Sequence, residues 1–308
     1  MNLILFEESE LEYPSSSSTT AATGSSQSTA EDSKETIAYV GLPSSDARTK
    51  HVQKVLKSEP GDWIRAGVID GPLCSVMVEE SSLELGVKFR IDFEAPIQGA
   101  GAEAGSMADP GVDLILCAPR PKVMARLWPT IAQLGVKRIC IITAERVEKA
   151  FWATHVLRPE FYRPLLLKGL EQASVDTTPT KVSVHPKSFE RFLNGELERS
   201  FPTDKYCRLV CHPYDGCSQL HEAVIDAVKC SGGDEPKRVV LALGPEGGWL
   251  DYEIEMLRER SFQCVTTMPR IFSTDVALTS LVSVAADARR YALCCREGED
   301  VSEEMERK

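Results

Sequence analysis

A glycine-rich stretch in residues 239–257, VVLALGPEGGWLDYEIEML, has the composition of a turn that another molecule can approach closely. Gly244, Gly247 and Gly248 carry no Cβ atom and adopt positive φ easily, so the main chain there is open to a ligand. Glu246 adds a carboxylate that could position a ligand or accept a proton. A tight strand-to-helix turn without a ligand explains the same residues equally well.

A second group of residues could bind a metal. The stretch CRLVCHPYDGC contains Cys207, Cys211, His212 and Cys217, which are zinc-ligand types. It contains no pair of CxxC knuckles, and its first half has the apolar pattern of a strand. We therefore expect no metal site and interpret the ten cysteines as reduced thiols in a reducing compartment.

Two common enzyme classes find no support in the motifs. GPEGG does not fit the GxGxxG fingerprint of dinucleotide enzymes and lies far from the first strand–helix unit. The chain has no GxSxG elbow, and its five histidines form no evident catalytic group with a nucleophile.

The charge of the chain is unevenly distributed. The net charge is −11, but residues 1–35 hold seven acids against Lys34, and residues 296–308 hold six acids against three bases. In the remainder, a basic stretch beginning near residue 46 is a candidate nucleic-acid contact, although a solvated helix face explains it as well. The cations of this stretch are Arg48, Lys50, Lys54, Lys57 and Arg65.

The elements that must position these residues fall into two parts. Apolar runs at LILFEE, TIAYVG, DWIRAGVID, LCSVMVEES and VKFRIDFEA predict a small β-barrel or sandwich, interrupted by a Ser-rich stretch that we expect to be disordered. After residue 111 the pattern alternates between strands and helices. Helices are predicted near 122–135, 158–174, 188–200, 217–230 and 274–294, with strands at VDLILCAP, RICIITAE, CRLVCHP, RVVLALG and QCVTTM. This alternation predicts a parallel α/β sheet, with Asp251 capping the helix after the glycine turn.

We expect neither a membrane span nor a targeting segment. No apolar run approaches the roughly 20 residues that cross a bilayer, and MNLILFEESE has no basic flank. A cytoplasmic location is the default expectation, and an organellar one stays open.

Several motifs in order resemble one family. LGPEGGW followed by PRIFSTDVAL, with QLGVKRICIITAERVEK, LEQAS and HVQKVLKSEPGDWIRAGVIDG upstream, is similar to the RsmE-type methyltransferases of small-subunit ribosomal RNA, in the SPOUT superfamily. The resemblance covers roughly residues 36–294.

The resemblance implies a domain plan. A PUA-like β-barrel RNA-binding domain would span 1–12 and 36–96, interrupted by a disordered insertion at 13–35. A flexible linker at 97–111 would lead to a SPOUT domain with a trefoil knot at 112–295, and an acidic tail would follow at 296–308. Family members bind S-adenosylmethionine in the knot and usually act as homodimers.

The resemblance also implies a reaction and its residues. The family methylates N3 of a uridine in small-subunit ribosomal RNA, which requires removal of the N3 proton or stabilisation of the uracil anion. We expect Glu246, Arg270 and Arg146 as catalytic residues and Arg48, Lys50, Lys54 and Lys57 as RNA contacts. The cofactor would be held by Leu243, Gly244, Pro245, Gly247, Gly248, Met268, Ile271, Phe272 and Ala277.

Departures from the family pattern keep an alternative open. Ser273 stands where an arginine is usual, Asp275 shortens an acid, and Met268 replaces a glycine. Thr130 and Gln133 replace a lysine and a glutamate. A catalytically impaired paralogue that acts as an RNA-binding or ribosome-assembly factor would show such changes.

Overall fold

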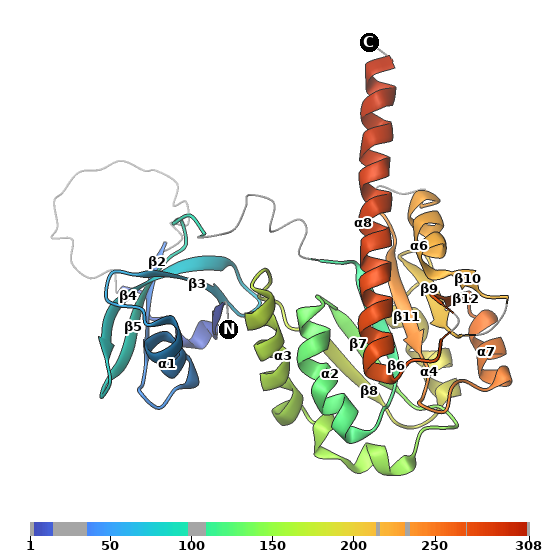
Figure 1. Cartoon of the computed structure of the whole chain (residues 1–308), viewed down its shortest axis with the longest axis horizontal. Helices are drawn as coiled ribbons and strands as arrows, with labels where there is room; N and C mark the ends of the chain where they lie inside the picture. The colour runs from blue at the N-terminus through green and yellow to red at the C-terminus, as the bar shows by residue number, and fades with distance from the viewer. Residues whose placement is uncertain are drawn as a thin grey trace, which may run out of the picture. The chain divides into compact units, whose positions relative to one another are not determined.

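The chain folds into two compact units (Figure 1). The computed structural model describes residues 3–14, 36–97, 109–213, 216–231, 235–268 and 270–306, with side chains up to Arg296. The first unit is Met1–Ala104 with Ser174–Thr178, and the second is Gly105–Ala173 with Pro179–Lys308. Most of the predicted Ser-rich insertion and of the predicted linker, residues 15–35 and 98–108, lies outside the described residues.

The first unit is built on a five-stranded sheet of the order β1-β3-β4-β5-β2. β1 pairs with β3 in parallel, and the other neighbours are antiparallel. All five strands predicted for this part are present, as β1 (Ile4–Phe6), β2 (Ile37–Leu42), β3 (Trp63–Val68), β4 (Leu73–Ser82) and β5 (Gly86–Asp92). A short 3₁₀ turn (Glu8–Glu10), helix α1 (Ala47–His51) and a π-helical turn (Val52–Leu56) connect them.

Alternate residues of these strands form the core of the first unit, as the period of two along a strand requires. Val40, Val76 and Ile91 are buried, and the rings of Phe6 and Phe89 pack with centroids 5.6 Å apart. The short segment Ser174–Thr178 joins this unit because Thr177 accepts a 3.1 Å hydrogen bond from the Asp70 amide and donates its hydroxyl to the Gly71 carbonyl. The predicted domain plan had assigned this segment to the second domain.

The second unit contains a seven-stranded sheet of the order β10-β12-β9-β11-β6-β7-β8, in which every pair is parallel. The predicted parallel α/β architecture is therefore confirmed. Its strands are β6 (Val112–Cys117), β7 (Arg138–Ile142), β8 (Lys181–His185), β9 (Tyr206–Cys211), β10 (Ser218–Gln219), β11 (Arg238–Leu243) and β12 (Phe262–Thr266). β8 and β10 were not predicted, because they are short edge strands without a buried apolar run.

The helices of the second unit follow the predicted order with three differences. They are α2 (Pro121–Gln133), α3 (Pro159–Ala173), α4 (Phe189–Gly195), α5 (Leu197–Ser200), α6 (Leu220–Lys229), α7 (Asp251–Arg258) and α8 (Thr274–Glu306). The helix predicted at 188–200 is divided at Glu196 into α4 and α5. Asp251 is the first helical residue of α7 rather than its N-cap, which is Leu250. α8 continues to Glu306, so it includes most of the acidic tail.

The connection order of this sheet reverses at its centre. The chain steps from β6 to β7 and β8 on one side, then crosses to β9, and later returns to insert β11 between β9 and β6. In parallel α/β sheets, ligands bind at such a reversal, beyond the carboxyl ends of the strands. The loops after β6, β9, β11 and β12 meet at this rim.

At the amino-end rim of the same sheet, Asp113 and Arg238 are paired with each other. Asp113 at the start of β6 is 1 % exposed and accepts hydrogen bonds from the Tyr206 hydroxyl at 2.8 Å and from Arg238 Nε at 3.0 Å. Burial, together with this carboxylate, raises the pKa of Tyr206 to about 12. These charges are satisfied within the fold, as buried ion pairs require.

Candidate active site

A cavity of about 720 Å³ opens at the carboxyl-end rim, where the connection order reverses. The glycine turn after β11 and residues 267, 268 and 270–275 after β12 form its walls, with contributions from the loops after β6 and β9 and from α2 and α8. All nine residues predicted to hold a cofactor line this cavity: Leu243, Gly244, Pro245, Gly247, Gly248, Met268, Ile271, Phe272 and Ala277.

The glycines of the turn are required by its geometry. Gly248 has a φ of +76° and closes the turn by donating its amide to the Pro245 carbonyl at 2.8 Å. A Cβ atom on Gly244 would lie 2.8 Å from Nε1 of Trp249, so only glycine allows the indole ring to pack there. The turn is thus fixed in shape while its main chain faces the cavity.

Trp249 leaves a polar atom unsatisfied at this site. The residue is 4 % exposed and lines the cavity, yet its Nε1 has no hydrogen-bond partner among the described residues. Buried donors are normally paired, so an orphan at a cavity wall is consistent with a ligand acceptor. The other lining residues are polar and apolar in similar numbers, and Phe272 and Leu281 are among the apolar ones. This combination fits a ligand with an apolar body and a few polar groups.

The two acids of the cavity are already paired with arginines of the loop after β6 and of α2. Glu246 Oε2 lies 2.7 Å from Arg120 Nε, and Asp275 Oδ2 lies 3.2 Å from Arg126 Nη2. Asp275 also accepts the Ser273 hydroxyl at 2.6 Å, and this hydrogen bond is the main cause of the lowered pKa of Asp275. Glu246 therefore contacts Arg120 at the start of α2. An acid that only capped the helix after the turn would instead contact the start of α7.

Arg270 has a different environment. It lies on the cavity wall, its side chain is exposed, and its guanidinium makes no ion pair with any described residue. Its backbone amide donates to the Met268 carbonyl at 2.8 Å, which holds the loop after β12 in place. Among the cavity arginines Arg120, Arg126 and Arg270, it is the one whose charge is not offset within the described chain.

Arg146, the third predicted catalytic residue, does not line the cavity. It follows β7, and its guanidinium donates a hydrogen bond to the Gly247 carbonyl from the outer side of the glycine turn. A Cβ atom on Gly247 would lie 3.0 Å from Arg146 Cδ, so the two residues are packed together. The geometry therefore gives Arg146 a supporting position behind the turn.

Sequence reasoning missed several residues at this site. Arg120, Arg126 and His212 line the cavity from the loop after β6, from α2 and from the loop after β9, and burial lowers the pKa of His212. Glu253 is fully buried and accepts hydrogen bonds from the Leu250 amide at 2.8 Å and from the Glu145 amide at 2.9 Å. Glu253 thereby ties the loop after β7 to the start of α7. An acid at the third position of a helix is the signal that could have indicated it.

The departures from the family pattern are distributed unevenly. Ser273 and Met268 line the cavity, whereas Thr130 and Gln133 do not. Met268 does not have a positive φ, so the glycine it replaces is not needed for the backbone here. Thr130 donates its hydroxyl to the Arg126 carbonyl within α2, at 3.3 Å.

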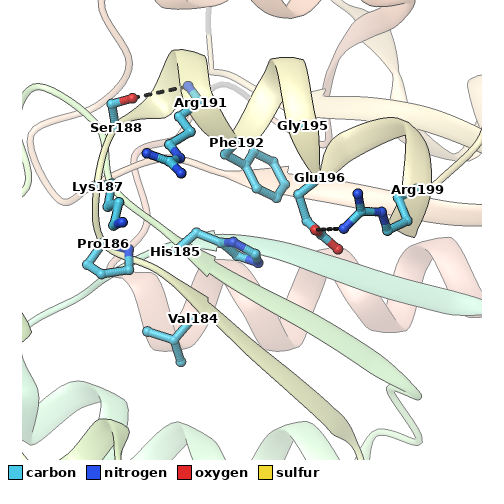
Figure 2. A pocket seen from close by; sticks show the side chains of 10 residues that line it. All are labelled: Val184, His185, Pro186, Lys187, Ser188, Arg191, Phe192, Gly195, Glu196 and Arg199. Carbon is cyan, nitrogen blue, oxygen red and sulfur yellow. Dashed lines mark hydrogen bonds and ion pairs between the residues drawn. The ribbon is translucent and has the colours of Figure 1, made fainter.

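A second hollow, of about 360 Å³, lies at the carboxyl end of β8 (Figure 2). Lys187 and Arg191 line it together with the His185 ring, which Figure 2 shows between Lys187 and Glu196. His185 contacts Phe192 with ring centroids 5.2 Å apart, and burial lowers the pKa of the imidazole. Glu196 accepts from Ser200 at 2.7 Å and lies 3.4 Å from Arg199.

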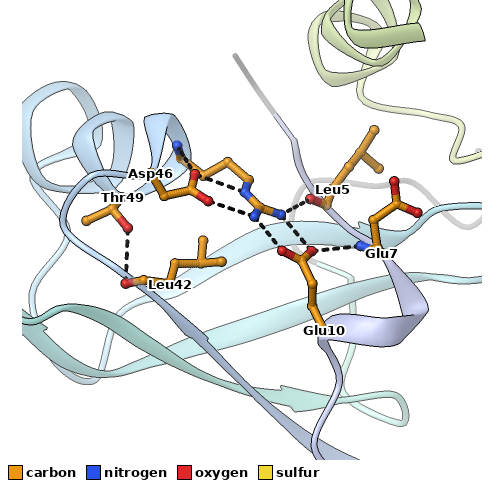
Figure 3. Close-up of polar contacts among 7 residues, drawn as sticks. Leu5, Glu7, Glu10, Leu42, Asp46 and Thr49 are labelled. Atoms are coloured by element: carbon orange, nitrogen blue, oxygen red, sulfur yellow. Dashed lines mark hydrogen bonds and ion pairs between the residues drawn. The ribbon is translucent and has the colours of Figure 1, made fainter. Parts of the chain in front are cut away.

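The predicted RNA contacts of the first unit separate into two kinds. Lys50, Lys54 and Lys57 are exposed. Arg48 is half-buried and holds α1 to the N-terminal strand: it pairs with Glu10 at 2.6 Å and Asp46 at 2.8 Å and donates to the Leu5 carbonyl (Figure 3). Its charge is therefore used within the fold. These contacts lower the pKa values of Glu10 and Asp46, mainly through the hydrogen bonds from Arg48.

Within the part of the chain that the structure describes, no group of three or more His, Cys, Asp or Glu side chains could hold a metal ion. Cys207 and Cys211 stand at opposite ends of β9, about 13 Å apart at 3.3 Å per residue, too far to share one ion. None of the described helices is long and apolar enough to span a membrane.

Comparisons with known proteins agree with this architecture. A ribosomal RNA small subunit methyltransferase E from Treponema pallidum (strain Nichols) is 22 % identical over 242 residues, which cover 78 % of this chain and 82 % of that protein. The solved structure of a ribosomal RNA small subunit methyltransferase E from Neisseria gonorrhoeae bound to S-adenosyl methionine has a TM-score of 0.56 at 20 % identity, covering 80 % of this chain and 91 % of that one. A Legionella pneumophila methyltransferase solved with bound SAM has a TM-score of 0.54 at 19 % identity, covering 82 % and 92 %.

A match to a family model identifies the family of the chain. A family model described as an RNA methyltransferase domain matches residues 108–286, which include the whole parallel sheet and the cavity. The resemblance to the RsmE-type enzymes that the motifs indicated is thus confirmed, and this chain belongs to the family of RNA methyltransferase domains.

Proposed function

We propose that this protein is an S-adenosylmethionine-dependent methyltransferase that acts on N3 of a uridine in small-subunit ribosomal RNA. The observation that carries the proposal is the 720 Å³ cavity, which gathers all nine predicted cofactor residues around the glycine turn. Relatives whose names state this RNA substrate, or whose structures hold this cofactor, support it.

The residues of the cavity fit the cofactor. The open main chain of Gly244–Gly248 and the unpaired Nε1 of Trp249 offer hydrogen-bonding groups, and Phe272, Ile271 and Leu243 offer apolar walls for an adenine ring and a methionine chain. When bound, S-adenosylmethionine supplies the electrophilic methyl group. The protein must then orient the uracil, remove the N3 proton and stabilise the negative charge that remains.

Arg270 is suited to the charge on the uracil. Removing the N3 proton leaves a negative charge shared between N3 and its flanking carbonyls, and a fixed cation beside it lowers the barrier. The guanidinium of Arg270 has no internal ion pair to give up, so it can meet the substrate directly. Glu246 would position the substrate or accept the N3 proton at the same wall, while Arg120 holds its carboxylate in place at 2.7 Å.

The finer features of the family complete the proposal. The segment after β12 and α8, which packs against β6 and β11, would form the trefoil knot of a SPOUT domain around the cavity. The first unit would be the PUA-like RNA-binding domain, with Lys50, Lys54 and Lys57 contacting phosphates. The enzyme would act as a homodimer, as the family usually does.

The catalytically impaired paralogue is less well supported by the geometry. Of the replaced residues, Thr130 and Gln133 do not line the cavity, and Ser273 donates its hydroxyl to the Asp275 carboxylate at 2.6 Å. The loss of an arginine at Ser273 is the one change that would remove a charge from the cavity wall.

Calorimetry with S-adenosylmethionine tests the proposal. Ala277→Trp should abolish binding because its indole would occupy the cavity, whereas Thr279→Trp, on an exposed position of the same helix outside the cavity, should bind like the wild type. Methyl transfer to a small-subunit ribosomal RNA transcript, with N3-methyluridine identified in the digest, is the second measurement. Binding without transfer to any such RNA would favour the impaired paralogue, and a folded protein that does not bind the cofactor would refute the enzyme.

A further inference from the structure

The hollow at the carboxyl end of β8 presents unpaired positive charge. Lys187 and Arg191 are exposed, line the same hollow and make no ion pair with any described residue (Figure 2). The one lining acid, Glu196, is engaged by Ser200 and Arg199. Two like charges held side by side repel each other, so an anion that enters between them is favoured.

This hollow lies on the same rim as the cavity. Leu243, Leu116, Ile142 and His185 belong to four neighbouring strands that pair in nearly continuous register, from β11 through β6 and β7 to β8. Three strand spacings of about 4.8 Å separate β11 from β8 by about 14 Å. At about 3.4 Å per stacked nucleotide, that distance corresponds to about four nucleotides of a nucleic-acid strand.

A direct side-chain contact connects the hollow to the glycine turn. Phe189, the first residue of α4, packs on Trp249 with ring centroids 5.6 Å apart. Arg191 lies two residues further along α4, and Trp249 lines the cavity. The helix that carries one of the two free cations is therefore held against the wall of the proposed cofactor site.

The nearby acids lie elsewhere. Glu190 on α4 and Glu145 after β7 are both near Tyr252 of α7, and neither lines the hollow. The opposite, amino-end rim keeps its arginines in internal pairs, as Arg238 with Asp109 and Asp113 demonstrates. The charge of Arg238 is therefore used within the fold, whereas Lys187 and Arg191 are unpaired among the described residues.

We propose that Lys187 and Arg191 bind phosphates of the RNA substrate a few nucleotides from the methylated base. The inference rests on the proposed function and deepens it, because it adds an RNA contact on the methyltransferase unit itself to the lysines expected on the first unit. A guanidinium and an ammonium that face one hollow are the groups that recognise phosphate oxygens.

The test uses the double variant Lys187→Gln/Arg191→Gln and the control Lys181→Gln. Lys181 is exposed on the same strand but at its amino end, on the opposite rim. The affinity for a small-subunit ribosomal RNA transcript is measured at 50 and 200 mM salt, and S-adenosylmethionine binding is measured by calorimetry. Two lost phosphate contacts reduce the salt slope by about 1.4, so the wild type should lose about sevenfold more affinity than the double variant over this range.

The outcomes separate this inference from the function on which it rests. A flatter salt slope and a raised KM for RNA in the double variant, with unchanged cofactor affinity and a wild-type-like control, support the phosphate site. If the wild type binds and methylates the RNA while the double variant and Lys187→Glu match it at both salt concentrations, the phosphate site is wrong and the proposed function stands. If the wild type binds no ribosomal RNA, both are wrong.

Discussion

At the scale of single residues, the arginines that line the cavity differ in whether they form an ion pair with another residue of the chain. Arg120 and Arg126 each hold an acid, whereas Arg270 is unpaired among the described residues although it lines the same cavity. An exposed arginine that stabilises nothing internally can be replaced without unfolding the protein, so its contribution to catalysis can be measured cleanly.

Arg270→Met should lower kcat for RNA methylation by about 10²- to 10³-fold, because one preorganised donor at a developing negative charge contributes about that much. S-adenosylmethionine affinity should change little. Arg290→Met, an exposed arginine on α8 paired with Asp287, is the matched control. A kcat within about threefold of the wild type would exclude Arg270 from stabilising the uracil anion.

Arg146 contacts the glycine turn but does not line the cavity, so we expect it to affect cofactor binding and not the chemical step. Arg146→Met removes the hydrogen bond to the Gly247 carbonyl and the packing against that residue. We expect the Kd for S-adenosylmethionine to rise about tenfold, the cost of about one hydrogen bond to a charged group. Arg146→Lys, which keeps one donor, should recover part of the affinity. Wild-type affinity in Arg146→Met, with a lowered kcat, would instead indicate direct contact with the substrate.

At the scale of elements, the rim of the parallel sheet is assembled by contacts between loops that are distant in sequence. Glu253 joins the loop after β7 to α7, and Glu246 joins the glycine turn to the start of α2. Both connections use a carboxylate to accept hydrogen bonds from main-chain amides that would otherwise be unpaired.

In the first unit, Arg48 performs the equivalent function for α1, and its two acidic partners make that connection sensitive to pH. The pKa values of Glu10 and Asp46 are lowered in the folded protein, so the stability they contribute is present above their unfolded pKa values, near 4, and is lost as the pH falls through the folded values. Both carboxyl groups are partly exposed, which limits the size of the effect.

Glu10→Gln should therefore destabilise the first unit by about 1 kcal/mol at pH 7. The difference from the wild type should shrink below pH 4, where Glu10 of the wild type becomes protonated as well. Urea unfolding followed by Trp63 fluorescence at several pH values measures this. A deficit that stays constant into acid would mean that the carboxylate charge of Glu10 is not what stabilises the fold.

At the scale of the whole molecule, the net charge of −11 and an RNA substrate are compatible because the charges are segregated. Acids concentrate in the first 35 residues and the last 13, while free cations remain on α1 and on the carboxyl-end rim. Local potential, and not net charge, decides where a polyanion binds.

Replacing Lys50, Lys54 and Lys57 together by glutamine should reduce the salt slope of RNA binding by about 2, at about 0.7 for each phosphate contact on single-stranded RNA. The fold should be unaffected, because all three side chains are exposed. Binding isotherms at several salt concentrations measure the slope, and Lys229→Gln on α6 provides the control. An unchanged slope would exclude Lys50, Lys54 and Lys57 from the RNA-binding surface.

The sequence by itself determined the parallel α/β architecture and the position of the glycine turn. Apolar runs between turn residues marked five strands of each unit, because burial on a sheet demands β-branched and other apolar side chains there. The glycines of GPEGG stood out because only glycine tolerates the positive φ at Gly248 and the close packing at Gly244. A backbone conformation of this kind depends on the residue at that position, so the local sequence can predict it.

Only the tertiary structure decided which charges are free. Arg48 and Lys50 look alike in the sequence, yet Arg48 is paired with Glu10, which lies 38 residues away. Arg120 and His212 reach the cavity because parallel strands bring distant loops to one rim. Lys187 and Arg191 could not be singled out before the edge strand β8 was known. Pairing between distant side chains depends on the strand order, and no local pattern encodes that order.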